Sequence, residues 1–136
     1  MNFKIDEKLL IDSIHLFDLN LSKVMLKNDK ENPWIVLIPR IENVVELIDL
    51  PMNLQLNLLE EINLISNFLK INFSPCKLNI ATIGNIVSQF HVHIIARYKT
   101  DRAWPNTIWG NQATVNFNDT ELLDIKNKFL EFKKQF

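Results

Sequence analysis

The feature that most constrains this chain is a row of polar side chains, Gln89, His91 and His93, in an otherwise apolar stretch. Residues 90–99 are typical of a largely buried β-strand. Alternate side chains of a strand point to the same face, so neighbours in the polar row lie roughly 6.5–7 Å apart. A buried face with polar groups usually has a function for them. The side chains predicted to point to the core are Phe90, Val92, Ile94 and Ala96.

Composition and charge exclude several classes of protein. The chain has 136 residues, 47% hydrophobic and 23% charged, which is typical of a single globular domain. A net charge of -1 argues against a broad nucleic-acid-binding surface, but it leaves room for a local phosphate site. Because Cys76 is the only cysteine, no intrachain disulfide is expected, which fits a cytoplasmic protein. The sequence contains neither a signal peptide nor an apolar run of about 20 residues, so no membrane association is expected.

The rest of the chain predicts an α+β fold. A helix of about 20 residues should start at Pro51 with a regular apolar stripe, and its Glu60 and Glu61 should face water. A second helix should begin at Asn118 as N-cap, with Glu121 completing a capping box. We expect a mainly antiparallel sheet of four or five strands. A short helix is predicted at residues 6–13, and the further strands at residues 14–17, 22–27, 34–38 and 77–83.

Connections between the strands also carry signals. The strands at residues 22–27 and 34–38 should pair as an antiparallel hairpin, with the second strand central because it is apolar on both faces. Gly84 and Asn85 are predicted to form the bend of a second hairpin, which leads into the histidine strand.

Four interpretations of His91 and His93 are open from the residues alone. They could be structural histidines bonded to backbone, or two zinc ligands on a strand, although no third ligand stands at a suitable spacing. They could also serve general acid–base catalysis near neutral pH. Finally, one imidazole could attack an electrophilic phosphorus. That chemistry needs a neutral ring whose far nitrogen holds its proton on an acceptor, and donors for the phosphoryl oxygens, which Gln89 and His93 would supply on either side of His91.

The run His91-Val92-His93-Ile94-Ile95-Ala96-Arg97 resembles the signature of the histidine triad (HIT) superfamily, His-φ-His-φ-His-φ-φ, where φ is apolar. The order of elements along the chain is also similar, and the resemblance describes residues 1–136 as one HIT-like domain. The first histidine of the triad falls on Gln89. Such a sequence is most similar to a bacterial subgroup with Gln there and a following Asp-x-Ala-Trp-Pro…Trp-Gly segment, here residues 101–105 and 109–110.

This resemblance implies a nucleotide hydrolase or nucleotidyl transferase. His91 would attack the α-phosphate of a nucleoside phosphoanhydride such as a diadenosine polyphosphate, and His93 would hydrogen-bond the phosphoryl oxygens. Gln89 would face the leaving group. Because a carboxamide has no proton to transfer at neutral pH, good leaving groups such as ADP or ATP should be preferred over amines.

Several further residues are implied by position. Asn28 matches the place of the ribose-binding polar residue, although it is equally suited to a turn, and Asp29 is an alternative. Arg97 could offset phosphate charge or form a surface ion pair. The remaining candidates for contact with the nucleotide are Asn79, Asn85 and Ser88.

The resemblance also implies a homodimer that binds a nucleotide substrate, with no resident cofactor or metal, although Mg²⁺ can accompany a polyphosphate. Trp104 and Trp109 would form a lid, a subunit interface or a simple packing contact on the sheet. Two other functions compete with the hydrolase: a nucleotide-binding module without turnover, and a metal-dependent hydrolase with His91 and His93 as ligands.

Overall fold

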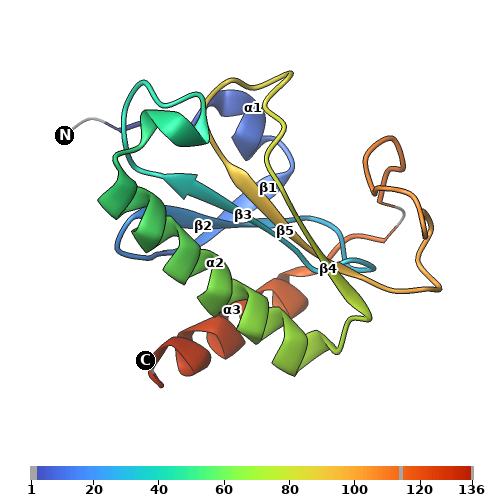
Figure 1. Ribbon diagram of the computed structural model, residues 1–136. Helices are drawn as coiled ribbons and strands as arrows, with labels where there is room; N and C mark the ends of the chain where they lie inside the picture. The colour runs from blue at the N-terminus through green and yellow to red at the C-terminus, as the bar shows by residue number, and fades with distance from the viewer. Residues whose placement is uncertain (1–2, 114, 136) are drawn as a thin grey trace.

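The structure is a computed structural model that describes residues 3–113 and 115–135. Its centre is an antiparallel five-stranded sheet with the order β1-β2-β3-β5-β4 (Figure 1). The α+β fold and the mainly antiparallel sheet predicted from the sequence are confirmed. The strands are β1 (Ser13–Asp18), β2 (Ser22–Lys27), β3 (Trp34–Pro39), β4 (Lys77–Ala81) and β5 (Val92–Arg97).

The central position predicted for residues 34–38 is confirmed, because β3 lies between β2 and β5 and every one of its residues is buried. β2 and β3 form the predicted hairpin. The second predicted hairpin needs a correction. β4 and β5 do pair, but residues 82–91 connect them, so Gly84 (φ +68°) and Asn85 lie in a long loop and not in a tight turn.

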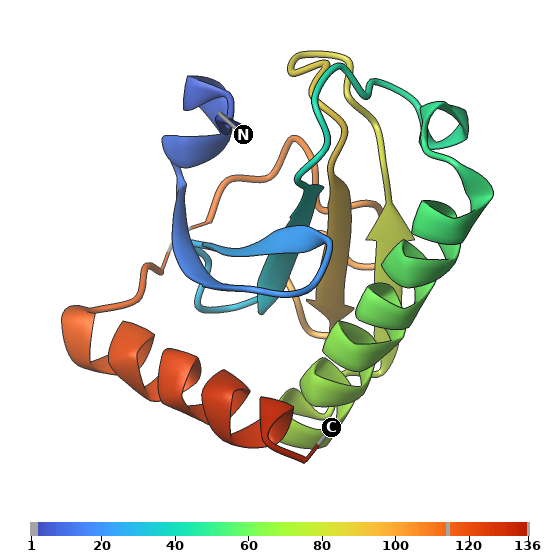
Figure 2. The ribbon, with the colours of Figure 1, turned by 90° about the vertical axis from the view of Figure 1, so that its left-hand side faces the viewer.

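Two long helices cover one face of the sheet, which we call the helix face (Figures 1 and 2). α2 (Met52–Phe73) ends at Ser74 in a left-handed conformation, and α3 (Asp119–Lys133) begins with the predicted capping box of Asn118 and Glu121. The helices meet near their C-terminal ends, where the rings of Phe68 and Phe129 stack with centroids 3.4 Å apart. The remaining helices are short: α1 (Glu7–Leu10) and the 3₁₀ helix η1 (Leu47–Asp49).

The core of the helix face includes Phe90, Val92 and Ile94, as predicted from strand alternation. One prediction for α2 is wrong: Glu60 is exposed, but Glu61 is only 7% exposed and accepts a hydrogen bond from the Leu21 N–H at 2.8 Å. An otherwise apolar stripe therefore contains a carboxylate that caps the turn between β1 and β2.

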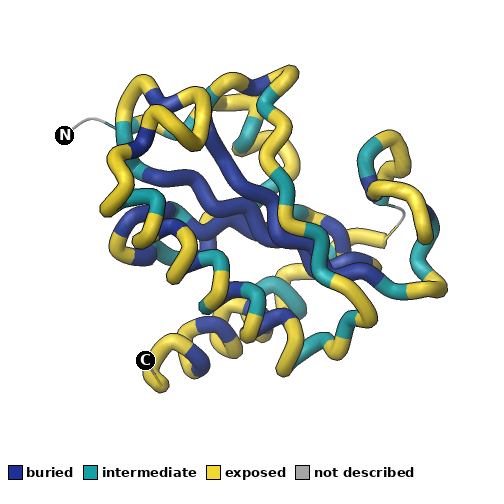
Figure 3. Tube along the Cα trace, viewed as in Figure 1, coloured by how far each residue is buried: buried dark blue, intermediate teal, exposed yellow. Residues whose placement is uncertain are grey.

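The opposite face of the sheet, which we call the loop face, is covered by segments with little regular structure. A second apolar cluster there joins Trp34, Val36 and Ile95 of the sheet to the N-terminal segment and to the loop after β5. Figure 3 shows the buried strands running between these covers. None of the helices in the described part of the chain combines the length and apolar character that a transmembrane helix needs.

Candidate active site

The histidine row lies on the loop face, where β5 begins. β5 starts only at Val92, so Gln89 and His91 lie just before the strand, and the predicted strand of residues 90–99 is too long at both ends. His91 and His93 are 6% and 5% exposed, and their ring centroids lie 4.9 Å apart at an interplanar angle of 74°. The two imidazoles are thus adjacent and almost fully enclosed.

His91 holds its ring proton on a backbone acceptor. Its Nδ1 lies 2.7 Å from the carbonyl oxygen of Gln89, and since a carbonyl oxygen can only accept, Nδ1 is the donor. In the neutral ring this leaves Nε2 without a hydrogen and with its lone pair available. An imidazole in this state has the form that nucleophilic attack on phosphorus needs.

His93 has the opposite arrangement of its nitrogens. The indole Nε1–H of Trp34 donates to Nδ1 of His93 at 2.9 Å, so the hydrogen of the neutral ring is on Nε2. Burial, together with repulsion from His91 and Lys27, lowers the pKa of His93 to about 3. His93 is therefore neutral at physiological pH and carries an Nε2–H donor on a ring whose centroid lies 4.9 Å from that of His91.

Trp109, from the loop after β5, completes an aromatic group around His93. Its ring centroid lies 5.1 Å from that of His93 and 5.5 Å from that of Trp34, and both contacts are edge-on. Trp104 lies elsewhere, with the guanidinium of Arg97 5.6 Å from its ring centroid. Within this chain Trp109 packs against the site, whereas Trp104 packs against a buried cation.

A cavity of about 650 Å³ adjoins Trp34 and Trp109, and we call it the loop-side cavity. It is lined by residues from β2 and its following turn, by residues 11–12, and by residues 108–113 and 116 of the loop after β5. Lys27 lies 5.1 Å from the ring centroid of Trp34 and forms an ion pair with Asp12 at 2.8 Å. An aromatic wall beside a cation and carbonyl-rich loops suits a ligand that has both a planar ring and polar groups.

The predicted ribose-binding residues both line this cavity. The Oδ1 of Asn28 accepts a hydrogen bond from the Phe117 N–H at 2.9 Å. Asp29 is 3% exposed and its Oδ2 lies 2.7 Å from Nη2 of Arg102, so the carboxylate already has a cationic partner. Of the two, Asn28 has the more adaptable side chain, since its amide NH₂ makes no hydrogen bond to the residues that the structure describes and can donate.

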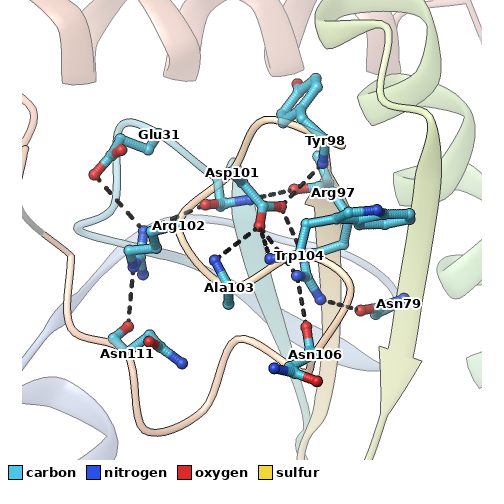
Figure 4. A network of polar contacts seen from close by, with 12 residues as sticks. Glu31, Asn79, Arg97, Tyr98, Asp101, Arg102, Ala103, Trp104, Asn106 and Asn111 are labelled. Atoms are coloured by element: carbon cyan, nitrogen blue, oxygen red, sulfur yellow. Dashed lines mark hydrogen bonds and ion pairs between the residues drawn. The ribbon is translucent and has the colours of Figure 1, made fainter.

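Arg97 and Asn79 belong to a buried network that attaches the loop after β5 to the sheet (Figure 4). Arg97 is 1% exposed and its guanidinium binds Asp101 through Nε at 2.9 Å and Nη2 at 3.1 Å. It also donates to Oδ1 of Asn79 and to the carbonyl of Asn106, both at 2.7 Å. The surface ion pair considered for Arg97 is therefore wrong, because the pair is buried and structural.

The predicted residues around the bend are separated from one another. Ser88 and Gln89 line a different cavity, which lies beside the N-terminal segment, while Asn85 is exposed in the loop between β4 and β5. The side chain of Gln89 bonds to the backbone of the N-terminal segment: Oε1 accepts from the Asp6 N–H and Nε2 donates to the Lys4 carbonyl, both at 2.8 Å. The described residues contain no group of three or more His, Cys, Asp or Glu side chains that could hold a metal ion.

Sequence reasoning missed three residues that shape the site: Trp34, Lys27 and Asp101. Trp34 was only the first residue of an apolar strand, and its pairing with Ile95, one strand over, depends on register. Lys27 is the last residue of β2 and belongs to no motif that the sequence shows. Asp101 was assigned no role, although its place in the Asp-Arg-Ala-Trp-Pro segment was the available signal.

Comparison with known proteins places this geometry in a family context. The HIT domain model matches residues 8–100. A histidine triad protein from Bradyrhizobium japonicum is 40% identical, with a TM-score of 0.90 and coverage of 95% of this chain and 96% of that chain. Histidine triad proteins from Sinorhizobium meliloti (TM-score 0.90, covering 95% and 96%) and Marinobacter aquaeolei (TM-score 0.91, covering 98% and 97%) are each 35% identical. No curated protein sequence matches the chain.

Proposed function

The chain belongs to the HIT domain family, and we propose that it is a nucleotide hydrolase or nucleotidyl transferase that works through a nucleotidyl-His91 intermediate. Proteins of this family generally bind or hydrolyse nucleotides. We also infer that it belongs to the bacterial subgroup with glutamine at the first position of the triad. The observation that carries the proposal is the pair of opposite tautomers on neighbouring rings: His91 has a bare Nε2, His93 has an Nε2–H donor, and the ring centroids lie 4.9 Å apart.

The reaction has two steps. In the first, Nε2 of His91 attacks the α-phosphorus of a nucleoside phosphoanhydride such as a diadenosine polyphosphate, and the bond from phosphorus to the leaving oxygen breaks. The Gln89 carbonyl stabilises the cationic ring that forms, because the Nδ1–H remains on it. In the second, water attacks the phosphorus, the N–P bond breaks, and the nucleoside monophosphate leaves with release of protons to solvent.

His93 supports both steps as a hydrogen-bond donor. A donor fixed where negative charge develops on the phosphoryl oxygens stabilises the transition state, and here it requires no change of protonation. The low pKa of His93 keeps this role constant over the physiological pH range. The nucleoside occupies the loop-side cavity, with Asn28 on the ribose and Trp34 and Trp109 near the base.

Gln89, which would face the leaving group, cannot act as a general acid, and this limits which leaving groups the protein can release quickly. The carboxamide has no proton to transfer, and both its polar atoms are bonded to backbone. We therefore expect faster turnover of a dinucleoside polyphosphate than of an adenosine phosphoramidate. Equal or faster turnover of the phosphoramidate would contradict this preference.

We further infer a cytoplasmic homodimer. β4 is an edge strand that exposes 51% of Ile80, and α2 exposes 55% of Leu56 and 52% of Leu59. Half-exposed aliphatic side chains on an open sheet edge and its flanking helix favour pairing with a second copy. Mg²⁺ would enter only with the polyphosphate substrate.

The decisive experiment is intact-mass spectrometry after brief mixing with a dinucleoside tetraphosphate. We expect one added nucleotidyl group and release of AMP. His91→Ala should abolish the adduct and slow turnover by at least about 10³-fold while it keeps nucleotide binding. His15→Ala is the matched control, because His15 is a half-exposed histidine on β1 paired with Asp18.

The same assay separates the alternatives. Full activity of His91→Ala would rule out the covalent mechanism. Saturable binding with neither adduct nor product would identify a binding module. Activity that follows added zinc and stops with a chelator would favour the metal-dependent hydrolase.

A further inference from the structure

The carboxamide of Gln89 binds the N-terminal segment at the two backbone positions on either side of Ile5. Oε1 accepts from the N–H of Asp6 and Nε2 donates to the carbonyl of Lys4, both at 2.8 Å. A primary amide offers a donor and an acceptor side by side, which is how a neighbouring strand pairs with backbone. The two nitrogens of an imidazole lie on different sides of the ring and cannot make this paired contact. Glutamine at this position is thus matched to the segment that lies beside it.

The N-terminal segment, residues 3–10, is held on the loop face by independent contacts as well. Phe3, Ile5 and Leu9 pack against the apolar cluster that contains Trp34. The carboxylate of Asp6 accepts from the Lys8 N–H at 2.9 Å and caps α1. The segment is therefore a defined wall of the site region, attached by apolar contacts at its sides and by Gln89 in its middle.

Between this wall and the rest of the protein lies a cavity of about 600 Å³, which we call the N-terminal cavity. It is bounded by residues 4–8, 41–45 and 88–89. Lys4 and Lys8 line it, and neither forms an ion pair within the described part of the chain. Of the two carboxylates there, Asp6 is engaged in capping α1 and Glu7 is exposed. Two flexible ammonium groups are thus available to an anion.

The N-terminal cavity is linked to His91 through a single residue. Gln89 lines the cavity and accepts the Nδ1–H of His91 on its backbone carbonyl. On the other side, the loop-side cavity is linked to His93 through Trp34, which lines that cavity and donates to Nδ1. Each histidine is therefore one hydrogen bond away from a residue that lines a cavity: for His93 the cavity with aromatic walls, and for His91 the cavity lined by lysines.

We propose that the N-terminal cavity is the subsite for a phosphorylated leaving group, a nucleoside di- or triphosphate, with Lys4 and Lys8 binding its phosphates. This inference rests on the proposed function and deepens it, since a substrate that fills both cavities is a dinucleoside polyphosphate. Gln89 is then a positioning residue: it holds the wall that carries the lysines. With Gln89 at the first position of the triad, the protein lacks the proton donor that a histidine would provide there. In its place the protein has a subsite for the leaving group.

The first test is direct binding of inorganic triphosphate, measured by calorimetry on the intact protein. Inorganic triphosphate has the three linked phosphates of a nucleoside triphosphate without the nucleoside, so it reports on the lysines whether or not turnover occurs. We expect Lys4→Gln/Lys8→Gln to weaken binding about fivefold or more. The charge-matched control Lys126→Gln/Lys128→Gln, on the exposed face of α3, should change it less than twofold. Equal weakening by both double variants, or no change in either, would overturn the proposal.

The second test compares two substrates with the same nucleotidyl group. A dinucleoside tetraphosphate has a phosphorylated leaving group, whereas the 4-nitrophenyl ester of AMP does not. We expect Lys4→Gln/Lys8→Gln to raise KM about fivefold for the first substrate only. Equal effects on both substrates would sink the subsite and leave the covalent mechanism intact. Absence of any His91 adduct would instead contradict the proposed function. The triphosphate titration would still show whether Lys4 and Lys8 bind phosphates in the N-terminal cavity.

Gln89 is tested by its own pair of variants. Gln89→Ala removes both contacts, whereas Gln89→Glu keeps an acceptor for Asp6 and places a second acceptor against the carbonyl of Lys4. Both should speed amide hydrogen exchange at residues 5–10 and weaken triphosphate binding, with Asn63→Ala on the exposed surface of α2 as control. Unchanged exchange at residues 5–10 in Gln89→Ala would refute the positioning role.

Discussion

The two faces of the sheet share the same strands but are covered in different ways. The helix face is covered by α2 and α3, which bury an almost entirely apolar cluster that includes Phe68 and Phe129. The loop face is covered by irregular segments, and it carries both site histidines and a buried Arg97–Asp101 ion pair. One face stabilises the fold mainly through apolar contacts, and the other holds polar groups in fixed positions.

The difference follows from how each cover satisfies its backbone. A helix pairs its own N–H and C=O groups, so it needs only an apolar surface toward the sheet. A loop cannot pair all of its own N–H and C=O groups, so its buried N–H groups need acceptors from side chains. Asp101 supplies them by accepting from the backbone of Tyr98 at 3.0 Å, Ala103 at 3.2 Å and Trp104 at 2.8 Å (Figure 4). A loop-covered face therefore brings buried polar side chains close to the site.

The largest effect on stability is expected from the helix face. Phe68→Ala removes a fully buried ring that stacks on Phe129, and it should lower the free energy of unfolding by about 3–5 kcal/mol. Urea denaturation measures this loss. Adduct formation per folded molecule should remain near wild type, because the site lies on the other face. A loss of adduct as large as that of His91→Ala would break the division between the two faces.

Asp101→Asn tests whether the polar cover of the loop face also contributes stability. Both side chains of the Arg97–Asp101 pair are 2% exposed, so removal of one charge leaves the other buried and unpaired. We expect a loss of about 3 kcal/mol in the free energy of unfolding. The control is Asp124→Asn on the exposed surface of α3, which should be neutral. A neutral result for Asp101→Asn would show that the network is dispensable.

Trp34→Phe should affect chemistry more than stability. Without the indole donor, Nδ1 of His93 can take up the ring hydrogen, so the pKa of His93 should rise from about 3 and both tautomers should be populated. The loss of one hydrogen bond of about 1 kcal/mol predicts a roughly fivefold decrease in kcat. The imidazole ¹⁵N shifts of His93 report the tautomer. Unchanged shifts would show that other contacts orient the ring.

The smallest effect concerns Glu61, the one buried carboxylate on the helix face among the residues that the structure describes. Burial raises the pKa of Glu61, and the hydrogen bond from Leu21 opposes this only in part. A raised folded-state pKa means that stability is greatest below the unfolded-state pKa and falls as pH rises through the folded value. Glu61→Gln should therefore flatten this fall between acidic and neutral pH, as followed by thermal unfolding. Glu60→Gln, its exposed neighbour, should leave the profile unchanged.

Most of the fold could be predicted because it depends on local patterns. Both long helices, the β2–β3 hairpin and the central place of β3 follow from periodicity, caps and apolar runs. The failures share a cause. Glu61 is charged, so the local pattern placed it in water, but the β1–β2 turn offers it the Leu21 N–H from 40 residues away.

In the candidate site, the sequence by itself determined which polar residues are near one another. The spacing of two keeps Gln89, His91 and His93 within one short stretch, although β5 begins only at Val92 and the Gln89 side chain bonds to the N-terminal segment. Tertiary structure decided what each nitrogen bonds to, because the partners come from distant segments: Trp34 is 59 residues from His93, and Asp6 is 83 residues from Gln89. Hydrogen-bond partners depend on strand register and on where the N-terminal segment packs, and no local pattern contains that information. The sequence therefore identified the polar row, and only the fold gave its three members different hydrogen-bond partners.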